Sequence, residues 1–125
     1  MILVMPDTSV WIEHLRSTDT ILSELLGDGE VLGHPFVSGE LALGNLRQRD
    51  DIIRISQRLP QAISASHEEV LRLIDREVLF GCGIGYVDAH LLAATRLTVG
   101  SKLWTRDRRL RAVAARLGLA AALSH

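Results

Sequence analysis

The chain has 125 residues, with 14 Lys and Arg against 15 Asp and Glu, and a formal net charge of −1. This charge excludes a uniformly basic surface, so any contact with nucleic acid must be local. A single cysteine, Cys82, excludes an intrachain disulfide, and no apolar run reaches the ~20 residues of a membrane span. The N-terminal apolar run is too short for a signal peptide and lacks a basic leader. We therefore expect a cytoplasmic protein with one domain over residues 1–125.

The N-terminal stretch predicts a buried strand that runs directly into a helix. Residues 2–5 are apolar without alternation, and Pro6 has no N–H for a sheet ladder, so the strand is expected to end there. Asp7, Thr8 and Ser9 follow, and then apolar residues at helical spacing. Asp7 thus comes after the carboxyl end of a strand, where open α/β sheets bind their ligands. The same residue is also a good helix cap, which is the purely structural interpretation.

The rest of the chain alternates helices with short strands. Pro35 suits the first position of a helix, and Ser66 with Glu69 forms a capping box. Helices are predicted over residues 21–26, 35–46, 50–59, 67–78, 86–97 and 106–117, and strands over 31–32, 62–65, 102–105 and 119–123. This order predicts a three-layer α/β domain, with a parallel central sheet of about four or five strands and helices on both faces.

Three further acids are candidate partners for Asp7. Glu40 is expected on the inner apolar stripe of its helix, where a lone carboxylate is costly unless it binds a cation or pairs with Arg47. Asp88 lies in the first turn of a helix that is apolar almost all round, although the helix dipole alone would also favour an acid there. Asp107 follows the strand at 102–105, and it too could be only a helix cap.

Taken together, the four acids predict a metal site. Strand ends in a parallel sheet share one edge, so these carboxylates can converge there. Clustered like charges need a counter-charge, which a divalent cation supplies. All-oxygen ligands suit Mg²⁺, or Mn²⁺, better than zinc. Such a centre suits phosphoryl chemistry, because the metal can activate water and stabilise the attacking and leaving oxygens.

In these residues the chain resembles the PIN-domain ribonucleases, and most closely the VapC toxins of bacterial VapBC toxin–antitoxin pairs. The resemblance runs through four ordered motifs, PDTSVWIEHL, HPFVSGELALGNL, YVDAHLLAA and KLWTRDRRL. It implies that Asp7, Glu40, Asp88 and Asp107 hold Mg²⁺ or Mn²⁺, with Ser9 and Thr105 as supporting hydroxyl residues. One departure is Met5-Pro6, which reads as an insertion between the strand and Asp7.

The resemblance also implies an activity and partners. We expect an endoribonuclease that cuts single-stranded or looped RNA, in tRNA or rRNA, and is held in check by a VapB-like antitoxin. A homodimer is common in the family. Arg106, next to Asp107, is the arginine best placed to meet an RNA phosphate. The arginines at 108, 109, 111 and 116 are expected on a solvated helix face, and the glycines at 81, 83 and 85 in a flexible loop near the site.

Three other classes compete with this interpretation. A receiver-like signalling domain would need an acidic pair after the first strand and a lysine at the end of the last, and the chain has neither. A metal-dependent phosphatase of the haloacid-dehalogenase type would need a second Asp where Ser9 stands. A binding module that has lost its activity would not retain all four acids.

Overall fold

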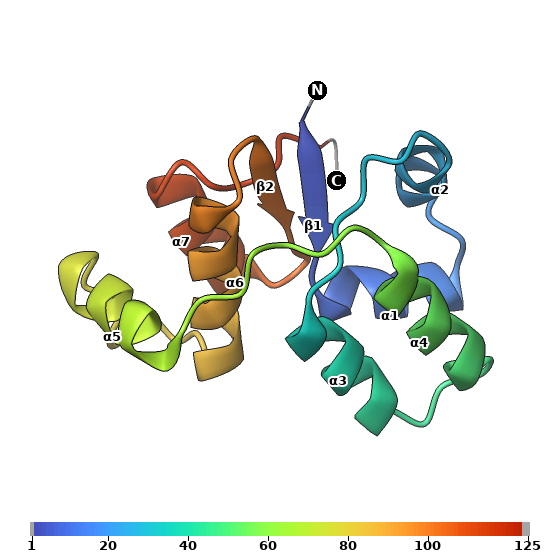
Figure 1. The fold of residues 1–125 in the computed structure, drawn as a ribbon, viewed down its shortest axis with the longest axis horizontal. Coiled ribbons are helices and arrows are strands. Elements are labelled where there is room, and N and C mark those ends of the chain that lie inside the picture. The colour runs from blue at the N-terminus through green and yellow to red at the C-terminus, as the bar shows by residue number, and fades with distance from the viewer. Residues whose placement is uncertain (1, 124–125) are drawn as a thin grey trace.

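The computed structural model describes residues 2–123, which form seven helices and a small parallel sheet (Figure 1). The elements are β1 (Leu3–Pro6), α1 (Thr8–Arg16), α2 (Thr20–Gly27), α3 (Pro35–Leu43), α4 (Arg49–Arg58), α5 (His67–Arg76), α6 (Tyr86–Leu97), β2 (Ser101–Trp104) and α7 (Arg108–Arg116). Every predicted helix is present. The last one begins at Arg108 because Asp107 caps it.

The sheet is smaller than the sequence predicts. β1 and β2 pair in parallel from Leu3 opposite Ser101 to Pro6 opposite Trp104. Three other segments join through one parallel bridge each, and the bridges are Val4 to Val31, Gly33 to Gln61 and Leu103 to Ala120. The prediction of four or five strands is therefore corrected: within residues 2–123, two strands are flanked by three segments too briefly paired to count as strands.

Pro6 explains why pairing stays short on one side of β1. Backbone N–H groups point alternately to the two neighbours of a strand. Leu3 and Asp7 donate toward β2, to the carbonyl oxygens of Gly100 and Trp104, and Val4 donates the other way, to Glu30. Pro6 falls on the same side as Val4 and has no N–H to extend the pairing there.

Met5 and Pro6 are part of β1. Both residues lie in register with β2, and Met5 is completely buried. The interpretation of this pair as an insertion between the strand and Asp7 is therefore wrong. Asp7 follows the strand directly, and its N–H continues the ladder with a 2.9 Å bond to Trp104.

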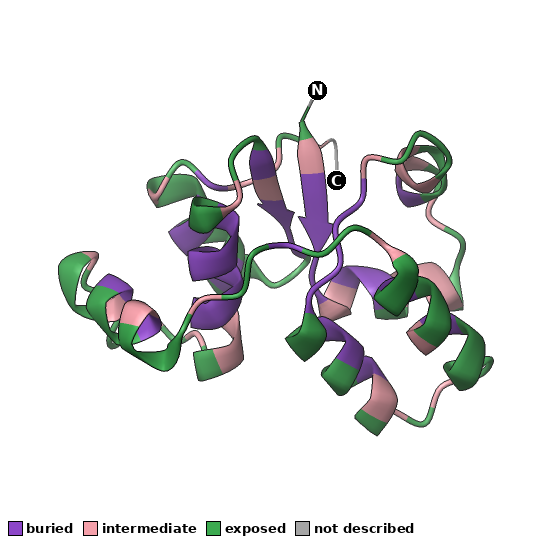
Figure 2. Cartoon of the chain, in the orientation of Figure 1, coloured by how far each residue is buried: buried purple, intermediate pink, exposed green. Residues whose placement is uncertain are grey.

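Helices flank the sheet on two sides. Figure 1 shows α1–α4 on one side of the two strands and α5–α7 on the other. Of these, α1 contacts β1 and α6 contacts β2. Buried residues gather on β1, β2 and α6 (Figure 2). The largest apolar side chains with almost no exposure include Met5, Trp11, Leu41, Leu92, Leu103 and Leu110.

Local capping fixes the helix starts that frame the site. The predicted capping box of Ser66 and Glu69 is present at α5. Pro35 is in the first turn of α3, and the His34 ring caps this helix by accepting a 3.0 Å hydrogen bond from the Phe36 N–H at Nδ1. Burial lowers the pKa of His34 to about 4, with a smaller contribution from His90, so the ring is neutral at pH 7. Sequence analysis gave no role to this histidine.

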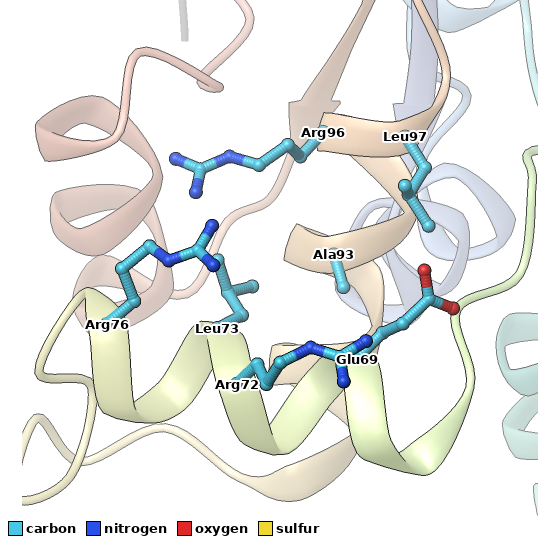
Figure 3. Close-up of a pocket in the computed structure, with 7 residues that line it drawn as sticks. All are labelled: Glu69, Arg72, Leu73, Arg76, Ala93, Arg96 and Leu97. Carbon is cyan, nitrogen blue, oxygen red and sulfur yellow. The ribbon is translucent and has the colours of Figure 1, made fainter.

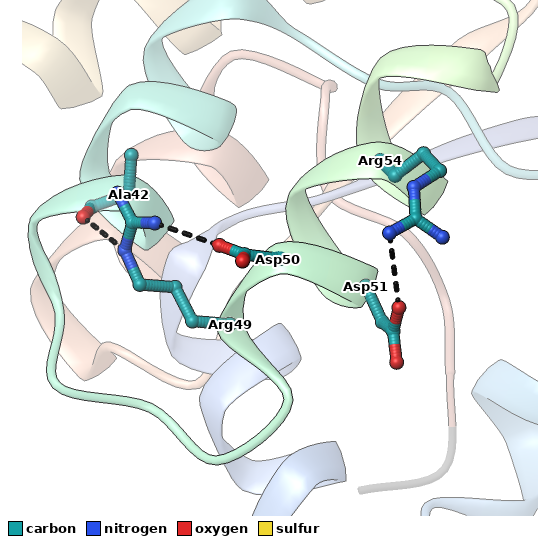
Figure 4. A network of polar contacts seen from close by, with 5 residues as sticks. All are labelled: Ala42, Arg49, Asp50, Asp51 and Arg54. Carbon is teal, nitrogen blue, oxygen red and sulfur yellow. Dashed lines mark hydrogen bonds and ion pairs between the residues drawn. The ribbon is translucent and has the colours of Figure 1, made fainter.

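The turn between α3 and α4 is held by charged side chains. Arg49 donates from Nε to the Ala42 carbonyl oxygen at 2.8 Å and pairs with Asp50 at 3.0 Å, while Arg54 pairs with Asp51 at 3.1 Å (Figure 4). The two acids lie in the first turn of α4, where the helix dipole favours negative charge.

None of the helices within residues 2–123 has the length and apolar character needed to cross a membrane.

Candidate active site

Asp7 is the most constrained of the four acids. It lies between β1 and α1, is 6% exposed, and caps the helix by accepting a 3.2 Å hydrogen bond from the Val10 N–H. Its carboxylate also accepts the hydroxyl protons of Ser9 and Thr105, each at 2.5 Å. Burial raises the pKa of Asp7, and these hydrogen bonds pull it partly back. Asp7 therefore caps α1, as the sequence predicts. Capping alone does not require a buried carboxylate or hydrogen bonds from two hydroxyl groups.

Ser9 and Thr105 connect Asp7 to the segment after β2. The Ser9 hydroxyl accepts a 3.0 Å hydrogen bond from the Arg106 N–H, and the Thr105 hydroxyl accepts one of the same length from the Asp107 N–H. Each hydroxyl therefore donates to Asp7 and accepts from the β2–α7 corner. The two residues hold both strand ends together, which agrees with the supporting role that the family resemblance implies.

Asp107 caps α7. Its Oδ1 accepts a 3.0 Å hydrogen bond from the Leu110 N–H, and the residue is exposed. The structural prediction that Asp107 is a helix cap is therefore confirmed. The remaining carboxylate oxygen has no hydrogen-bond donor within residues 2–123.

Asp88 lies in the first turn of α6, as predicted, and is partly buried. Its Oδ2 accepts a 3.1 Å hydrogen bond from the Gly85 N–H at the start of the helix. Burial raises the pKa of Asp88, and the negative charges of Asp107 and Glu40 raise it further. The charge of Asp88 in turn raises the pKa of Asp7.

Glu40 is not where the sequence pattern put it. It is exposed on α3, and the flanking apolar residues Phe36 and Leu43 are 38% and 90% exposed. The buried residues of this helix are Val37, Ser38 and Leu41. The inner stripe was therefore assigned to the wrong face, because α3 carries apolar residues on all sides. Burial gives no reason for an acid here, and the structure shows no pairing with Arg47.

Glu40 nevertheless turns toward the other acids. Its Oε1 accepts a 2.5 Å hydrogen bond from the hydroxyl of Thr8, the residue next to Asp7. Asp88 interacts electrostatically with all of the other three acids, two of which raise its own pKa. The four carboxylates thus come from four different helices or helix caps, and each interacts electrostatically with at least one other of the four.

The chemistry of the four acids suits a hard divalent cation. All of its ligands would be carboxylate oxygens, and no Lys or Arg within residues 2–123 forms an ion pair with any of the four acids. A cation would supply the counter-charge that such a cluster requires. In the described part of the chain, no three Asp, Glu, His or Cys side chains lie close enough together to hold an ion as they stand. Binding would therefore require side-chain rotation, which the exposed Glu40 and Asp107 can provide.

Two arginines of the predicted solvated face also donate hydrogen bonds to backbone carbonyl oxygens. Arg111 donates from Nη2 to the Thr105 carbonyl oxygen at 3.3 Å, and Arg116 donates from Nη1 to the Glu77 carbonyl oxygen at 3.0 Å. Both residues are exposed, as predicted for a solvated helix face. Arg106 is exposed beside Asp107, where an RNA-contacting residue would have to be.

Arg109 covers the glycine loop that leads into α6. A Cβ atom on Gly83 would come within 2.7 Å of the Arg109 Cδ atom, so the side chain lies directly over the loop. Gly83 also has a φ of +79°, which L side chains rarely adopt. Sequence analysis missed this contact, because two residues 26 positions apart give no spacing signal.

A parallel sheet covered by helices, with Asp7, Asp88 and Asp107 at helix starts and Glu40 on α3 hydrogen-bonded to the residue after Asp7, is the arrangement expected of a PIN-type nuclease domain. The chain was compared with protein-family models and with individual proteins. No protein-family model matches the chain. It is 51% identical over 120 residues to proteins named Ribonuclease VapC32 from two strains of Mycobacterium tuberculosis, CDC 1551 and H37Rv. The match covers 96% of this chain and 97% of each relative. The chain therefore belongs to the VapC family of PIN-domain ribonucleases.

Proposed function

We propose that Asp7, Glu40, Asp88 and Asp107 form the metal-dependent catalytic centre of this VapC ribonuclease, in a single domain that cuts RNA phosphodiester bonds. Membership of the family makes the chain the RNA-cleaving toxin of a VapBC toxin–antitoxin pair. It also removes support from the receiver and phosphatase alternatives. One observation carries the assignment of the site: Thr105 joins Asp7 to the Asp107 backbone, and Thr8, next to Asp7, donates a hydrogen bond to Glu40.

Each acid has a distinct part in the proposed centre. Asp7 is held by two hydroxyls and a backbone N–H, so its position is fixed before any substrate binds. Asp88 is fixed by Gly85. Glu40 and Asp107 are exposed, and each has one carboxylate oxygen hydrogen-bonded, to Thr8 and to the Leu110 N–H, so each would offer its other oxygen to a cation. Mg²⁺ or Mn²⁺ bound among them would lower the pKa of an attacking water and stabilise the charge that develops on the phosphate.

The partners follow from the same proposal. The substrate is a tRNA or rRNA segment, with Arg106 contacting a phosphate beside Asp107. A VapB-like antitoxin blocks the acidic centre, and the toxin acts in the cytoplasm as a homodimer. The close similarity to proteins named as VapC ribonucleases supports these assignments.

RNA cleavage by the purified chain tests the proposal directly. With Mg²⁺ the wild type should cut RNA, and both EDTA and the Asp7→Asn or Asp88→Asn variants should abolish cutting. Neither variant should unfold the protein, because removing one charge from the cluster relieves repulsion. The exposed Asp28, far in sequence from the four acids, provides the matched control Asp28→Asn, which should cut RNA normally. Undiminished cleavage by a folded Asp7→Asn variant would contradict the proposed centre.

A further inference from the structure

A second charged hollow lies between α5 and α6, outside the acidic centre. Its volume is about 150 Å³. Three of its lining residues are arginines, Arg72 and Arg76 from α5 and Arg96 from α6, and the apolar ones are Leu73, Ala93 and Leu97 (Figure 3). Figure 3 shows the side chains of Arg76 and Arg96 extending toward one another across the space between the two helices.

Helix geometry places Arg72 and Arg76 together along the α5 side of the hollow. Arg72 and Arg76 are four residues apart, so they share a face of α5, next to the side on which Val70 and Leu73 are buried. On α6, the small Ala93 leaves room for the hollow. The long arginine side chains therefore surround a floor that is mostly apolar.

The charges of the hollow are only partly compensated. Glu77 pairs with Arg96 at 3.3 Å. Glu69 also lines the hollow, and hydrogen bonds with Ser66, together with a smaller effect of the Arg72 charge, lower its pKa. Within residues 2–123, Arg72 and Arg76 form no ion pair. Two like charges at this spacing disfavour a helix slightly. A bound anion would remove that cost.

We propose that the Arg72–Arg76–Arg96 hollow binds a backbone phosphate of the RNA, at a distance from the bond that is cut. This inference rests on the proposed ribonuclease function. Guanidinium groups form paired hydrogen bonds with phosphate oxygens, and the apolar floor suits a ribose or a base face. Arg96 lies eight residues after Asp88 on α6, a rise of about 12 Å along the helix. One RNA strand can therefore contact both places.

A phosphate fits this hollow better than an acidic protein segment does. Arginines from two helices border one small volume, which favours a compact group with several acceptor oxygens. The hollow also shares α6 with the acidic centre, where the substrate must lie. Because phosphate contacts carry no sequence information, this site would position the RNA and add affinity without choosing the cleavage sequence.

The test compares two double variants of equal charge. Arg72→Gln/Arg76→Gln removes the two unpaired arginines, and Arg47→Gln/Arg58→Gln removes two exposed arginines on the α3–α4 side of the fold. Binding of single-stranded RNA of about 12 nucleotides is measured in EDTA over a range of salt concentrations. The first variant should bind roughly tenfold more weakly, with a salt slope about 1.4 smaller if two phosphate contacts are lost. The difference in affinity between this variant and the wild type should be smaller for RNA of about 4 nucleotides, because so short a strand cannot contact both the acidic centre and the hollow. The second variant should bind nearly as the wild type does.

Three outcomes would overturn the inference. Equal weakening by both variants would mean a general charge effect. Unchanged RNA binding by the first variant would exclude the hollow as an RNA site. Loss of binding to a polyglutamate peptide with RNA binding intact would assign the hollow to an acidic protein partner. Circular dichroism melts check that both variants are folded. A wild type that binds RNA through these arginines but never cuts it would contradict the ribonuclease proposal and leave this inference standing.

Discussion

The hydroxyl of Thr105 donates a 2.5 Å hydrogen bond to Oδ2 of Asp7, although the two residues are 98 positions apart in the chain. Parallel pairing of β1 with β2 brings them together, because both strands end at the same edge. Thr105 is buried, and its hydroxyl also accepts from the Asp107 N–H. One side chain therefore determines the surroundings of two of the proposed metal ligands.

We expect Thr105→Val to impair the site more than the fold. The change keeps the shape but removes a hydrogen bond that lowers the pKa of Asp7, so this pKa should rise further. The acid limb of the pH–rate profile for RNA cleavage should then move to higher pH. The free energy of unfolding should fall by about 1–3 kcal/mol, the cost of removing a hydrogen bond from a buried charge. Thr95→Val is the control, because that buried hydroxyl donates to the Leu91 carbonyl oxygen and, within residues 2–123, contacts none of the four acids. An identical pH profile for both variants would contradict this role of Thr105.

Glu40→Gln separates metal binding from structure. Glu40 is exposed, so the change should alter the free energy of unfolding by less than about 0.5 kcal/mol. As a lost metal ligand, it should lower RNA cleavage by about 100-fold or more, with partial recovery at high Mg²⁺. Glu24→Gln, on the exposed side of α2, should cleave RNA like the wild type. Near-normal activity of Glu40→Gln at low millimolar Mg²⁺ would remove Glu40 from the centre.

His34 should make the protein less stable in mild acid. Its pKa is about 4 in the folded chain and 6.5 without burial, so the unfolded chain binds more protons between these two pH values. The resulting stability is complete above pH 6.5 and is lost as the pH falls toward 4, by at most about 3 kcal/mol. His34→Asn keeps a capping side chain and should flatten the slope in urea unfolding from pH 4 to 7. A smaller slope should remain from His90, whose pKa is also lowered, mainly by burial. An unchanged slope would mean that His34 does not control this loss.

Gly83 and Gly81 allow the contact with Arg109 to be tested. Both glycines have positive φ, but only at Gly83 would a Cβ meet Arg109. Substitution by Ala should cost each variant about 1 kcal/mol of stability for the backbone conformation. Only Gly83→Ala should also lower kcat/KM for RNA, because it displaces Arg109 from the loop before Asp88. In a double-mutant cycle, Gly83→Ala should add little to Arg109→Ala. Full additivity would show that the contact does not matter for activity.

Sequence reasoning succeeded where the local signal was strong. The helix from Tyr86 to Leu97 was predicted with its observed bounds, because its apolar run lies between a glycine loop and a polar turn. The capping box at Ser66 and the N-terminal proline of α3 were equally local signals. The strand before Asp7 was found because four consecutive apolar residues suit a strand covered on both faces.

It failed where the outcome depended on contacts across the fold. The stripe assigned to Glu40 was on the wrong face, because apolar residues around all of α3 leave its orientation to tertiary packing. The outer segments of the sheet form one bridge each, and no periodicity could show how briefly they pair. The contacts of Thr105 with Asp7, of Arg106 with Ser9 and of Arg109 with Gly83 join segments that are distant in the sequence, so no local pattern could predict them.

The hydrogen bond between Asp7 and Thr105 determines when, during synthesis of the chain, the proposed active site can form. Thr105 is translated 98 positions after Asp7, and Asp107 follows two residues later. A nascent chain lacking the β2–α7 corner cannot hold the Asp7 carboxylate in place or supply the fourth acid. Because a domain folds as a unit, the proposed site can assemble only after the segment with Thr105 and Asp107 has left the ribosome. The order in which the proposed site residues are made therefore delays assembly of the site until the β2–α7 corner has been synthesised.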